Sequence, residues 1–308
     1  MTKHYLGIDI GGTKIKTVIL NGEGEILEQD EVLTEDGAID AEFWKKKIVS
    51  KITEKTNQYA KKNNRSLQCA ISAPGLVDKK NQMILHMPER LQGIENFNWS
   101  EELQQGIKVI NDGHSACLAE YESFYKKQEI QHMLMLTLGT GVGGGIIVNG
   151  DLYQGDLQRA GHVGHMTVAY DGAPTMTNMP GSLEHAMGNY SVSERTEGRY
   201  QSVHELVDAY KKGEEKAEKW WLESVQKLAV ALASLTNILS PELIVLGGGI
   251  TAGAKASLME PLQDFMTRYE WRPKGYKVKL EAARHGSFAG AIGAAFFARN
   301  NNSQSRDK

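Results

Sequence analysis

The sequence predicts a two-domain α/β protein in which one structural unit occurs twice. Its 308 residues suit two domains of roughly 150 residues each, and β-branched segments alternate with amphipathic ones. A pattern of strand, glycine turn, strand and Asn-Gly turn occurs at residues 5–33 and returns at residues 132–153. We therefore expect an N-terminal domain at 1–117, with the C-terminal helix 287–308 packing back on it, and a second domain at 118–286.

The first half begins with strands that glycine turns separate. Gly11-Gly12 interrupts the first apolar run, and Asn21-Gly22-Glu23-Gly24 is a typical hairpin turn. A helix follows, because apolar residues then recur at near-helical spacing. In chain order we expect strands at 5–10, 14–20, 25–33, 67–71 and 107–110, and helices at 41–62 and 111–125.

The second half repeats this order and adds a long helix. The loop Gly139–Gly145 separates two apolar runs, as Gly11-Gly12 does in the first half. Pro241 ends a helix whose apolar positions share one face. In chain order we expect strands at 132–138, 146–148 and from 152, a helix at 217–240, a strand at 243–246, the glycines 247–249 before a helix start, and a helix at 289–298.

Composition and charge exclude several classes of protein. Hydrophobic residues make up 41% and charged residues 24%, so a disordered chain or a coiled coil is excluded. The net charge of −3, with no basic block, gives no electrostatic basis for a nucleic-acid or membrane partner. The two cysteines, Cys69 and Cys117, suit a reducing compartment. Since no signal peptide or membrane-spanning run is found, we expect a cytoplasmic protein.

The glycine loops are the strongest chemical signal. Gly139–Gly144 matches the dinucleotide pattern G-x-G-x-x-G, but a strand follows it where that pattern needs a helix. A glycine turn in a hairpin can still hold phosphate on successive backbone N–H groups; the alternative is a plain tight turn. Three such loops occur, and Thr13 and Thr140 add hydroxyls that can donate to phosphate oxygens.

Several segments together resemble one known family. They are DIGGTK at residues 9–14, SAPGLVD at 72–78, VINDGHSACLAE at 109–120, TLGTGVGGG at 137–145 and PELIVLGGGI at 241–250. In this order they resemble the ROK family of sugar kinases and related repressors, with glucokinase-like and β-glucoside kinase-like members. The resemblance implies an actin-like (RNase H-like) two-domain ATPase fold with duplicated β-hairpin phosphate loops and an interdomain cleft. It also implies a homodimer.

The resemblance implies ATP as the nucleotide and Mg²⁺ as its companion. Asp9 would act near Mg²⁺, through water; the alternative is a carboxylate that accepts from turn N–H groups. Lys14 could neutralise phosphate or cap the exposed side of a strand. The implied ATP contacts are Asp9, Gly11, Gly12, Thr13, Lys14, Thr137, Gly139, Thr140, Gly141, Gly143, Gly247, Gly248 and Gly249.

Asp112 is the candidate catalytic base. Phosphoryl transfer needs a carboxylate near the attacking hydroxyl to accept its proton. The alternative is that the Asn111-Asp112 pair only caps a helix, but the resemblance assigns the base to the Asp of this pair. The sugar contacts that it implies are Gly75, Asn111, Asp112, His162, His165 and Glu184. His114 could relay a proton, although an ordinary helix position explains it better.

The segment after residue 160 departs from the family pattern. His162 stands where the family has a sugar-binding Glu, and Thr175, Thr177 and Ser182 replace three cysteines that bind structural zinc with His165. Hydroxyls do not substitute for thiolates as zinc ligands. The pair His162 and His165 has no evident third ligand. We therefore expect no protein zinc site.

The predicted function is ATP-dependent phosphorylation of a hexose or hexose-containing sugar at its 6-hydroxyl. Glucose, a β-glucoside such as cellobiose, and N-acetylmannosamine all remain open substrates. A sugar-responsive ROK-type regulator is the first alternative, but such proteins carry a helix-turn-helix domain before the first loop, and eight residues precede Asp9 here. A non-catalytic sugar-binding module is the second, and the presence of Asp112 and all three loops opposes it.

Overall fold

The computed structural model of the chain describes residues 3–34, 41–63, 66–87, 91–175 and 178–303. Two units, each built on its own five-stranded sheet, make up the fold. Unit 1 comprises Met1–Glu129, Leu152–Ala160 and Ser287–Lys308; unit 2 comprises Ile130–Asp151 and Gly161–Gly286.

The division differs from the predicted domains in two short segments. We placed residues 118–129 and 152–160 in the second domain, and both lie in unit 1. The first segment continues a helix that packs within unit 1, so no break occurs at residue 117. The second is tied to unit 1 by Gln158, whose amide donates to the Lys79 carbonyl at 3.3 Å. Residues from Ser287 onward lie in unit 1.

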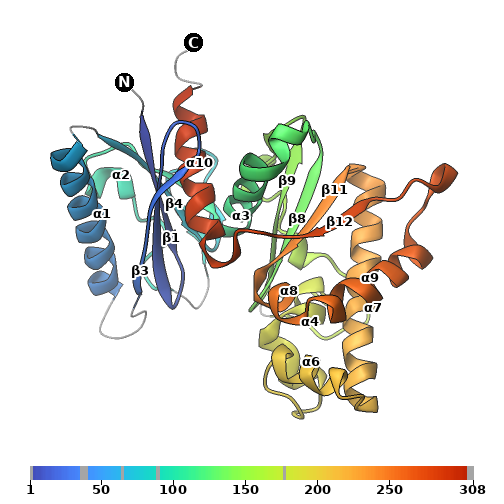
Figure 1. The fold of residues 1–308 in the computed structure, drawn as a ribbon. Helices are drawn as coiled ribbons and strands as arrows, with labels where there is room; N and C mark the ends of the chain where they lie inside the picture. Colours follow the sequence, from blue (N-terminus) through green and yellow to red (C-terminus); the bar gives the residue numbers. More distant parts are fainter. Residues whose placement is uncertain (1–2, 35–40, 64–65, 88–90, 176–177, 304–308) are drawn as a thin grey trace. The chain divides into compact units, whose positions relative to one another are not determined.

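The sheet of unit 1 has the strand order β3-β2-β1-β4-β7 (Figure 1). Its first three strands pair antiparallel, and β4 and β7 continue the sheet in parallel. β1 is buried along nearly its whole length, which explains its continuous apolar run. The strands are β1 (His4–Ile10), β2 (Lys14–Leu20), β3 (Ile26–Leu33), β4 (Leu67–Ala73) and β7 (Lys108–Asn111), with a small hairpin of β5 (Leu76–Val77) and β6 (Ile84–His86).

Helices cover both faces of this sheet. Figure 1 shows α1 (Ala41–Asn63) and α10 (Ala289–Ser303) on opposite sides of it. Ile48 and Ile52 of α1 join one apolar cluster, and α10 joins the other. α10 approaches β1 so closely that a Cβ at Gly7 would lie 1.9 Å from the Ala291 carbonyl oxygen. α10 is therefore an integral layer of unit 1.

The helix predicted at 111–125 is shorter in the structure. α3 spans Asp112–Glu120, and Tyr121–Tyr125 form a π-helical turn. Tyr121 and Tyr125 remain buried in this turn, so the apolar spacing of the segment does not distinguish it from an α-helix. A further short helix of unit 1, α2, spans Trp99–Glu102.

The sheet of unit 2 repeats the arrangement of the first, with the order β10-β9-β8-β11-β12. An antiparallel hairpin is again followed by parallel neighbours. Its strands are β8 (Met133–Leu138), β9 (Val142–Val148), β10 (Asp151–Leu152), β11 (Leu243–Gly247) and β12 (Lys279–Ala282). β9 begins at Val142, so the glycine loop is shorter than the predicted 139–145, because Gly143 to Gly145 pair with β8.

Six α-helices of unit 2 are described. They are α4 (Leu183–Met187), α5 (Val192–Arg195), α6 (Val203–Lys211), α7 (Glu215–Leu239), α8 (Gly248–Ala254) and α9 (Ala256–Tyr269). α7 is amphipathic as predicted: Trp221, Val225, Leu228 and Leu232 on its inner face are fully buried. Ser240, in the left-handed region at φ 46°, ends α7 one residue before Pro241.

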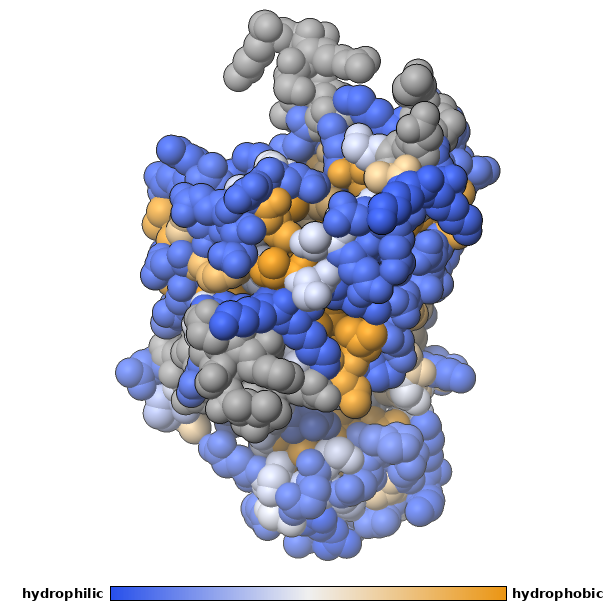
Figure 2. All heavy atoms as spheres, turned by 90° about the vertical axis from the view of Figure 1, so that its left-hand side faces the viewer, coloured by the Kyte–Doolittle hydropathy of each residue, from blue (hydrophilic) through white to orange (hydrophobic). Residues whose placement is uncertain are grey.

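Hydrophilic residues dominate the face drawn in Figure 2, where apolar areas are of limited extent. Exposed apolar side chains of unit 1 include Ile26, Leu27 and Leu33 on the edge strand β3. Within the described residues, no helix combines the length and the hydropathy that crossing a membrane requires.

Candidate active site

The first glycine loop, Gly11–Lys14, closes the hairpin between β1 and β2. The Gly11 N–H donates to the Lys14 carbonyl at 3.0 Å, and the Thr34 hydroxyl donates to the Gly11 carbonyl at 2.5 Å. Among the described residues, the N–H groups of Gly12 and Thr13 have no protein acceptor. Two successive free N–H groups form a concavity that suits an anion. This loop can therefore hold a phosphate.

In the structure, the Lys14 side chain contacts a carboxylate of the neighbouring strand. Its ammonium forms an exposed ion pair with the Glu31 carboxylate of the neighbouring strand β3. This matches the alternative in which Lys14 caps the exposed side of a strand, and its contact with phosphate stays a prediction.

Asp9 is a half-buried carboxylate at the end of β1. The Ser72 hydroxyl donates to its Oδ1 at 2.7 Å, so its protein partner in the described chain is a side chain rather than the turn N–H groups. Gly290, in the first turn of α10, leaves room for it, since a Cβ there would lie 2.5 Å from Oδ1. Burial raises the pKa of Asp9 to about 6; Ser72 and Lys16 lower it, and Asp112 raises it. A bound cation would relieve this cost of ionisation.

Asn111, rather than Asp112, caps α3. Its Oδ1 accepts from the N–H groups of Gly113 at 2.9 Å and His114 at 3.2 Å, and its Nδ2 donates to the Gly75 carbonyl at 3.0 Å. Asn111 is therefore largely engaged, and one Nδ2 hydrogen is left for a sugar hydroxyl. Asp112 follows as the first helical residue and is exposed, with Oδ1 accepting from the Gly113 N–H at 2.8 Å.

The structure thus brings together the predicted sugar contacts of unit 1, namely Gly75, Asn111 and Asp112. Gly75 must be glycine, because its φ is +103° and a Cβ would lie 2.6 Å from the His86 carbonyl oxygen. His114 is fully buried, and burial lowers its pKa, so the imidazole is neutral. Its Nε2 contacts the Ala160 carbonyl and therefore carries the hydrogen. A structural role explains His114 without a proton relay.

The second glycine loop, Gly139–Gly141, closes the hairpin between β8 and β9. The Gly139 N–H donates to the Gly141 carbonyl at 3.0 Å, which parallels the first loop. In the described chain, the N–H groups of Thr140 and Gly141 again have no protein acceptor. Both loops therefore present two successive free N–H groups at the tip of a hairpin.

The third glycine segment lies beside the second loop. Thr137 pairs with Gly143 across the β8–β9 hairpin and with Gly247 across the parallel pair β8–β11. Gly248, with φ +87°, packs against the end of β8, where a Cβ would lie 2.3 Å from the Leu138 carbonyl oxygen. The predicted ATP contacts of unit 2 are thus neighbours at one end of its sheet.

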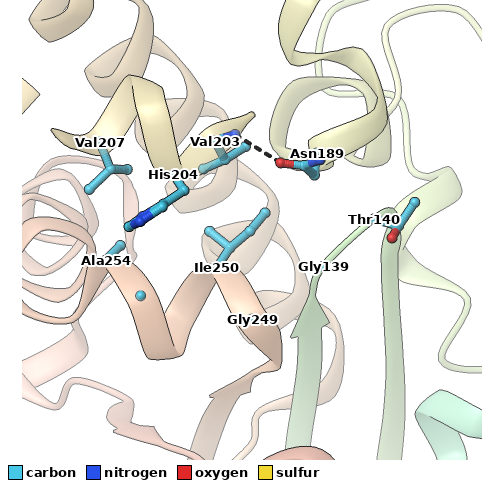
Figure 3. Close-up of a pocket in the computed structure, with 10 residues that line it drawn as sticks. Gly139, Thr140, Asn189, Val203, His204, Val207, Gly249, Ile250 and Ala254 are labelled. Carbon is cyan, nitrogen blue, oxygen red and sulfur yellow. Dashed lines mark hydrogen bonds between the residues drawn. The ribbon is translucent and has the colours of Figure 1, made fainter. Parts of the chain in front are cut away.

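A pocket of about 350 Å³ opens next to these glycines (Figure 3). Its walls come from the second loop, the first turns of α6 and the helix α8. Asn189 is fixed at its edge, because its Oδ1 accepts from the Val203 N–H at 2.8 Å. The lining residues are Gly139, Thr140, Asn189, Val203, His204, Val207, Gly249, Ile250, Gly253 and Ala254. Apolar walls with few polar groups are typical of a pocket for a small molecule.

The predicted sugar contacts of unit 2 lie on two segments. His162 precedes and His165 ends a short turn, Val163–His165, and their rings stack with centroids 6.2 Å apart and an interplanar angle of 8°. Glu184 lies in the first turn of α4, and its Oε2 accepts from the Val142 N–H at 3.1 Å. The carboxylate of Glu184 therefore contacts the second glycine loop.

The segment that departs from the family's zinc pattern is held by hydrogen bonds. The Ser182 hydroxyl caps α4 by accepting from the His185 N–H at 3.1 Å, and the Thr175 hydroxyl accepts from the Met179 N–H at 3.3 Å. Thr177 lies outside the described residues. The described part of the chain contains no cluster of three His, Cys, Asp or Glu side chains that could hold a metal ion.

Sequence reasoning missed several residues that contact the candidate site. Lys16 and Ser72 surround Asp9; the hairpin turn could have revealed Lys16, since β1 and β2 pair Asp9 with Lys16. Ser72 comes from β4, which pairs with β1 in parallel. Asn189 and His204 of the pocket follow no glycine pattern, and no local signal marks them.

Comparison with known proteins identifies the family. The ROK family model matches residues 5–301. The chain is 29% identical to a glucokinase from Halalkalibacterium halodurans, over 96% of this chain and 94% of that protein. It is 30% identical to an N-acetylmannosamine kinase from Vibrio cholerae, over 94% and 98%. A ROK hexokinase structure from Thermus thermophilus superimposes with a TM-score of 0.83, at 26% identity over 98% of this chain and 99% of that one.

These matches span nearly the whole chain and include the loops described above. The fold is the actin-like two-domain α/β fold of ROK sugar kinases. The chain belongs to the ROK family.

Proposed function

We propose that this protein is an ATP-dependent kinase that phosphorylates the 6-hydroxyl of a hexose or hexose-containing sugar. The observation that carries the proposal is the pair of hairpin loops, each with two successive N–H groups free to hold phosphate. The relatives named glucokinase and N-acetylmannosamine kinase support a sugar as the acceptor.

The nucleotide is assigned to the glycine loops and to the pocket beside the second loop. Each loop offers phosphate oxygens its own pair of N–H groups, Gly12 and Thr13 in unit 1 and Thr140 and Gly141 in unit 2. The purine ring takes the pocket, where Val207 and Ile250 supply apolar walls and Asn189 supplies an amide. The volume of about 350 Å³ falls within the range of small-molecule pockets.

Asp112 accepts the proton of the attacking hydroxyl. Its carboxylate is exposed while Asn111 supplies most of the capping of α3, so the helix does not depend on its charge. Asp9 is the residue that would hold Mg²⁺, through water, because its buried anion lacks full compensation. When bound, Mg²⁺ neutralises charge on the phosphates.

The sugar specificity is assigned to His162. A carboxylate at this position accepts from two sugar hydroxyls, whereas a neutral imidazole offers one donor and one acceptor. Fewer sugar hydroxyls are therefore hydrogen-bonded on that side of the ring than in relatives with Glu. We propose that the enzyme accepts a sugar substituted near the anomeric carbon, such as cellobiose, at least as well as glucose.

A coupled ADP-release assay tests the proposed function. Wild-type protein with Mg²⁺ and ATP is supplied with glucose, N-acetylmannosamine or cellobiose, and a reaction without sugar is the control. ADP release that depends on a sugar supports the kinase. Release that no hexose or hexose-containing sugar stimulates contradicts it.

The same assay with His162→Glu tests the assignment of specificity. We expect the variant to shift kcat/KM toward glucose and away from cellobiose, because two hydroxyls are again held. If neither protein phosphorylates cellobiose, this assignment is wrong, and His162 only fills space beside a site for an ordinary monosaccharide.

A further inference from the structure

One short segment of unit 2 fastens the second glycine loop. Residues 184–190 approach the loop from α4 and the turn after it. The Val142 N–H donates to Glu184 Oε2 at 3.1 Å, the Asn189 N–H donates to the Gly139 carbonyl at 3.0 Å, and the Tyr190 N–H donates to the Thr140 carbonyl at 3.1 Å. We call these three hydrogen bonds the loop clamp.

The loop clamp depends on close packing. A Cβ at Gly141 would lie 2.5 Å from Glu184 Oε2, and a Cβ at Gly188 would lie 2.8 Å from the Thr140 carbonyl oxygen. Real Cβ atoms essentially never approach so closely. The glycine at position 141 therefore serves contact with Glu184 as well as the turn itself.

The loop clamp also holds the loop around its two free N–H groups. The carbonyls of Gly139 and Thr140 are held on the side of residues 189 and 190, and the Val142 N–H is taken by Glu184. The N–H groups of Thr140 and Gly141 are the two that remain without an acceptor among the described residues. Fixing them before the nucleotide arrives removes part of the ordering cost of binding.

Glu184 has a second carboxylate oxygen. Oε1 accepts no hydrogen bond within the described chain, and Glu184 is partly exposed. Under the proposed function, on which this inference rests, Glu184 is a sugar contact. One carboxylate then bonds the sugar through Oε1 and the phosphate loop through Oε2, and both bonds are charge-assisted.

We propose that Glu184 is a positioning residue that couples sugar binding to nucleotide binding. A sugar hydroxyl on Oε1 restricts the side chain to the rotamer that holds Val142, so the loop is already ordered when the nucleotide binds. By linkage, nucleotide tightens sugar binding by the same factor. The first loop is held instead by Thr34, whose N–H and hydroxyl donate to the Thr13 and Gly11 carbonyls and which is not one of the proposed sugar contacts.

Calorimetric titration of the non-hydrolysable analogue AMPPNP, with Mg²⁺, tests this coupling. The whole protein is titrated alone and with a saturating concentration of the sugar that has the highest kcat/KM in the ADP-release assay. For wild type we expect sugar to tighten AMPPNP at least about fivefold, the lower end of typical couplings. For Glu184→Ala we expect the effect of sugar to vanish, and the affinity without sugar to fall about tenfold through loss of a charged hydrogen bond.

Two further variants make the result specific. Glu184→Gln keeps an oxygen for the Val142 N–H, so it should recover much of the affinity for AMPPNP alone, which also shows that the segment folds. Glu194→Gln removes a carboxylate whose charge, like that of Glu184, acts on Tyr190; in the described chain its Oε2 lies 3.4 Å from His185 Nε2 rather than on the loop, and we expect the variant to keep the wild-type coupling.

The inference is overturned if Glu184→Ala keeps the wild-type coupling or binds AMPPNP alone as wild type does. It is also overturned if wild type phosphorylates a sugar yet binds AMPPNP equally with and without it. This last outcome leaves the proposed function intact. A wild type that phosphorylates no sugar contradicts the proposed function, and with it the coupling, whereas the titrations without sugar still report whether Glu184 orders the loop.

Discussion

The two hairpin glycine loops share one pattern of backbone N–H groups, but different residues hold each loop in place. In each, the first glycine N–H is bonded within the turn, and the next two N–H groups have no acceptor among the described residues. The first loop is supported by Thr34, and Asp9, opposite Lys16 in the β1–β2 register, lies just before it. The second is fastened by the loop clamp from Glu184 to Tyr190.

This difference shows how a duplicated element can take on two tasks. The hairpin and its glycines depend on residues close together in the sequence, so both copies present two successive N–H groups in an arrangement suited to phosphate. The supporting residues come from distant parts of the chain and have diverged. One loop therefore adjoins a titratable carboxylate suited to a cation, and the other adjoins a proposed sugar contact.

Substitution of Asp112 should lower catalysis without weakening nucleotide binding by either glycine loop. We expect Asp112→Asn to lower kcat by about 10²–10⁴-fold, the typical contribution of a general base, while AMPPNP binding stays near the wild-type value. Asn keeps an oxygen for the Gly113 N–H, so α3 should remain intact. Steady-state ADP release and calorimetry measure the two quantities. The exposed Asp151→Asn is the charge-matched control, and substantial activity in Asp112→Asn would remove Asp112 from its role.

Neutralising Asp9 should stabilise the protein. Burial raises its folded pKa to about 6 from an ordinary 3.8, so the folded state prefers the protonated form. Stability from this group is complete below pH 3.8 and is lost as pH rises through 6. Asp9→Asn should therefore be more stable than wild type at pH 7.5, by on the order of 3 kcal/mol, although sugar phosphorylation falls.

Denaturant unfolding at pH 7.5 and pH 4 measures this effect. We expect the gain in the free energy of unfolding to shrink strongly toward pH 4, where wild-type Asp9 is largely protonated in the folded state. An Asn variant less stable than wild type at pH 7.5 would show that the carboxylate is well compensated and would argue against a cation near Asp9.

A glycine-to-alanine substitution should affect stability differently in the two loops. In Gly141→Ala the new Cβ meets Glu184 Oε2 at 2.5 Å, whereas in Gly12→Ala it meets nothing within 4 Å. We expect Gly141→Ala to push the Glu184 carboxylate off the Val142 N–H and to lose about 1–3 kcal/mol of stability with that charged hydrogen bond, whereas Gly12→Ala should unfold as wild type does. Thermal unfolding without nucleotide gives the comparison. Equal melting temperatures for both variants would contradict the loop clamp.

Metal chelation should have the smallest effect on the stability of the protein. The hydroxyls of Ser182 and Thr175 accept backbone hydrogen bonds, and hydroxyls are poor zinc ligands. We expect elemental analysis to find no stoichiometric zinc and the melting temperature to stay unchanged in EDTA. One zinc per chain, or a melting temperature that falls in chelator, would show that the segment beside α4 binds metal after all.

The sequence predicted local features well and long-range partners poorly. The strand predicted at 14–20 is β2, and the helix predicted at 41–62 is α1, which ends at Asn63. Periodicity and glycine turns carry this information because they depend on neighbouring residues. The start of β9 was misplaced, since Gly143 has no side chain to reveal its pairing with β8.

In the candidate site, too, local features could be predicted from the sequence and long-range contacts could not. Asp9 lies near the end of β1 just before a glycine turn, Asn111 and Asp112 lie where β7 meets α3, and motif spacing identifies all three. The contact of Ser72 with Asp9 and of Glu184 with Val142 joins residues far apart in sequence. The capping function of Asn111 could be predicted from its position, but its bond to the Gly75 carbonyl could not. Tertiary structure decides these pairs.

Product analysis tests the central claim most directly. Wild-type protein is incubated with Mg²⁺, ATP and each sugar of the panel, and ADP and sugar phosphate are quantified together by ³¹P NMR. The account predicts one sugar phosphate for every ADP, with the phosphate on the 6-hydroxyl, and almost none with Asp112→Asn. ADP that forms without any phosphorylated sugar, or equal product from Asp112→Asn, would contradict it.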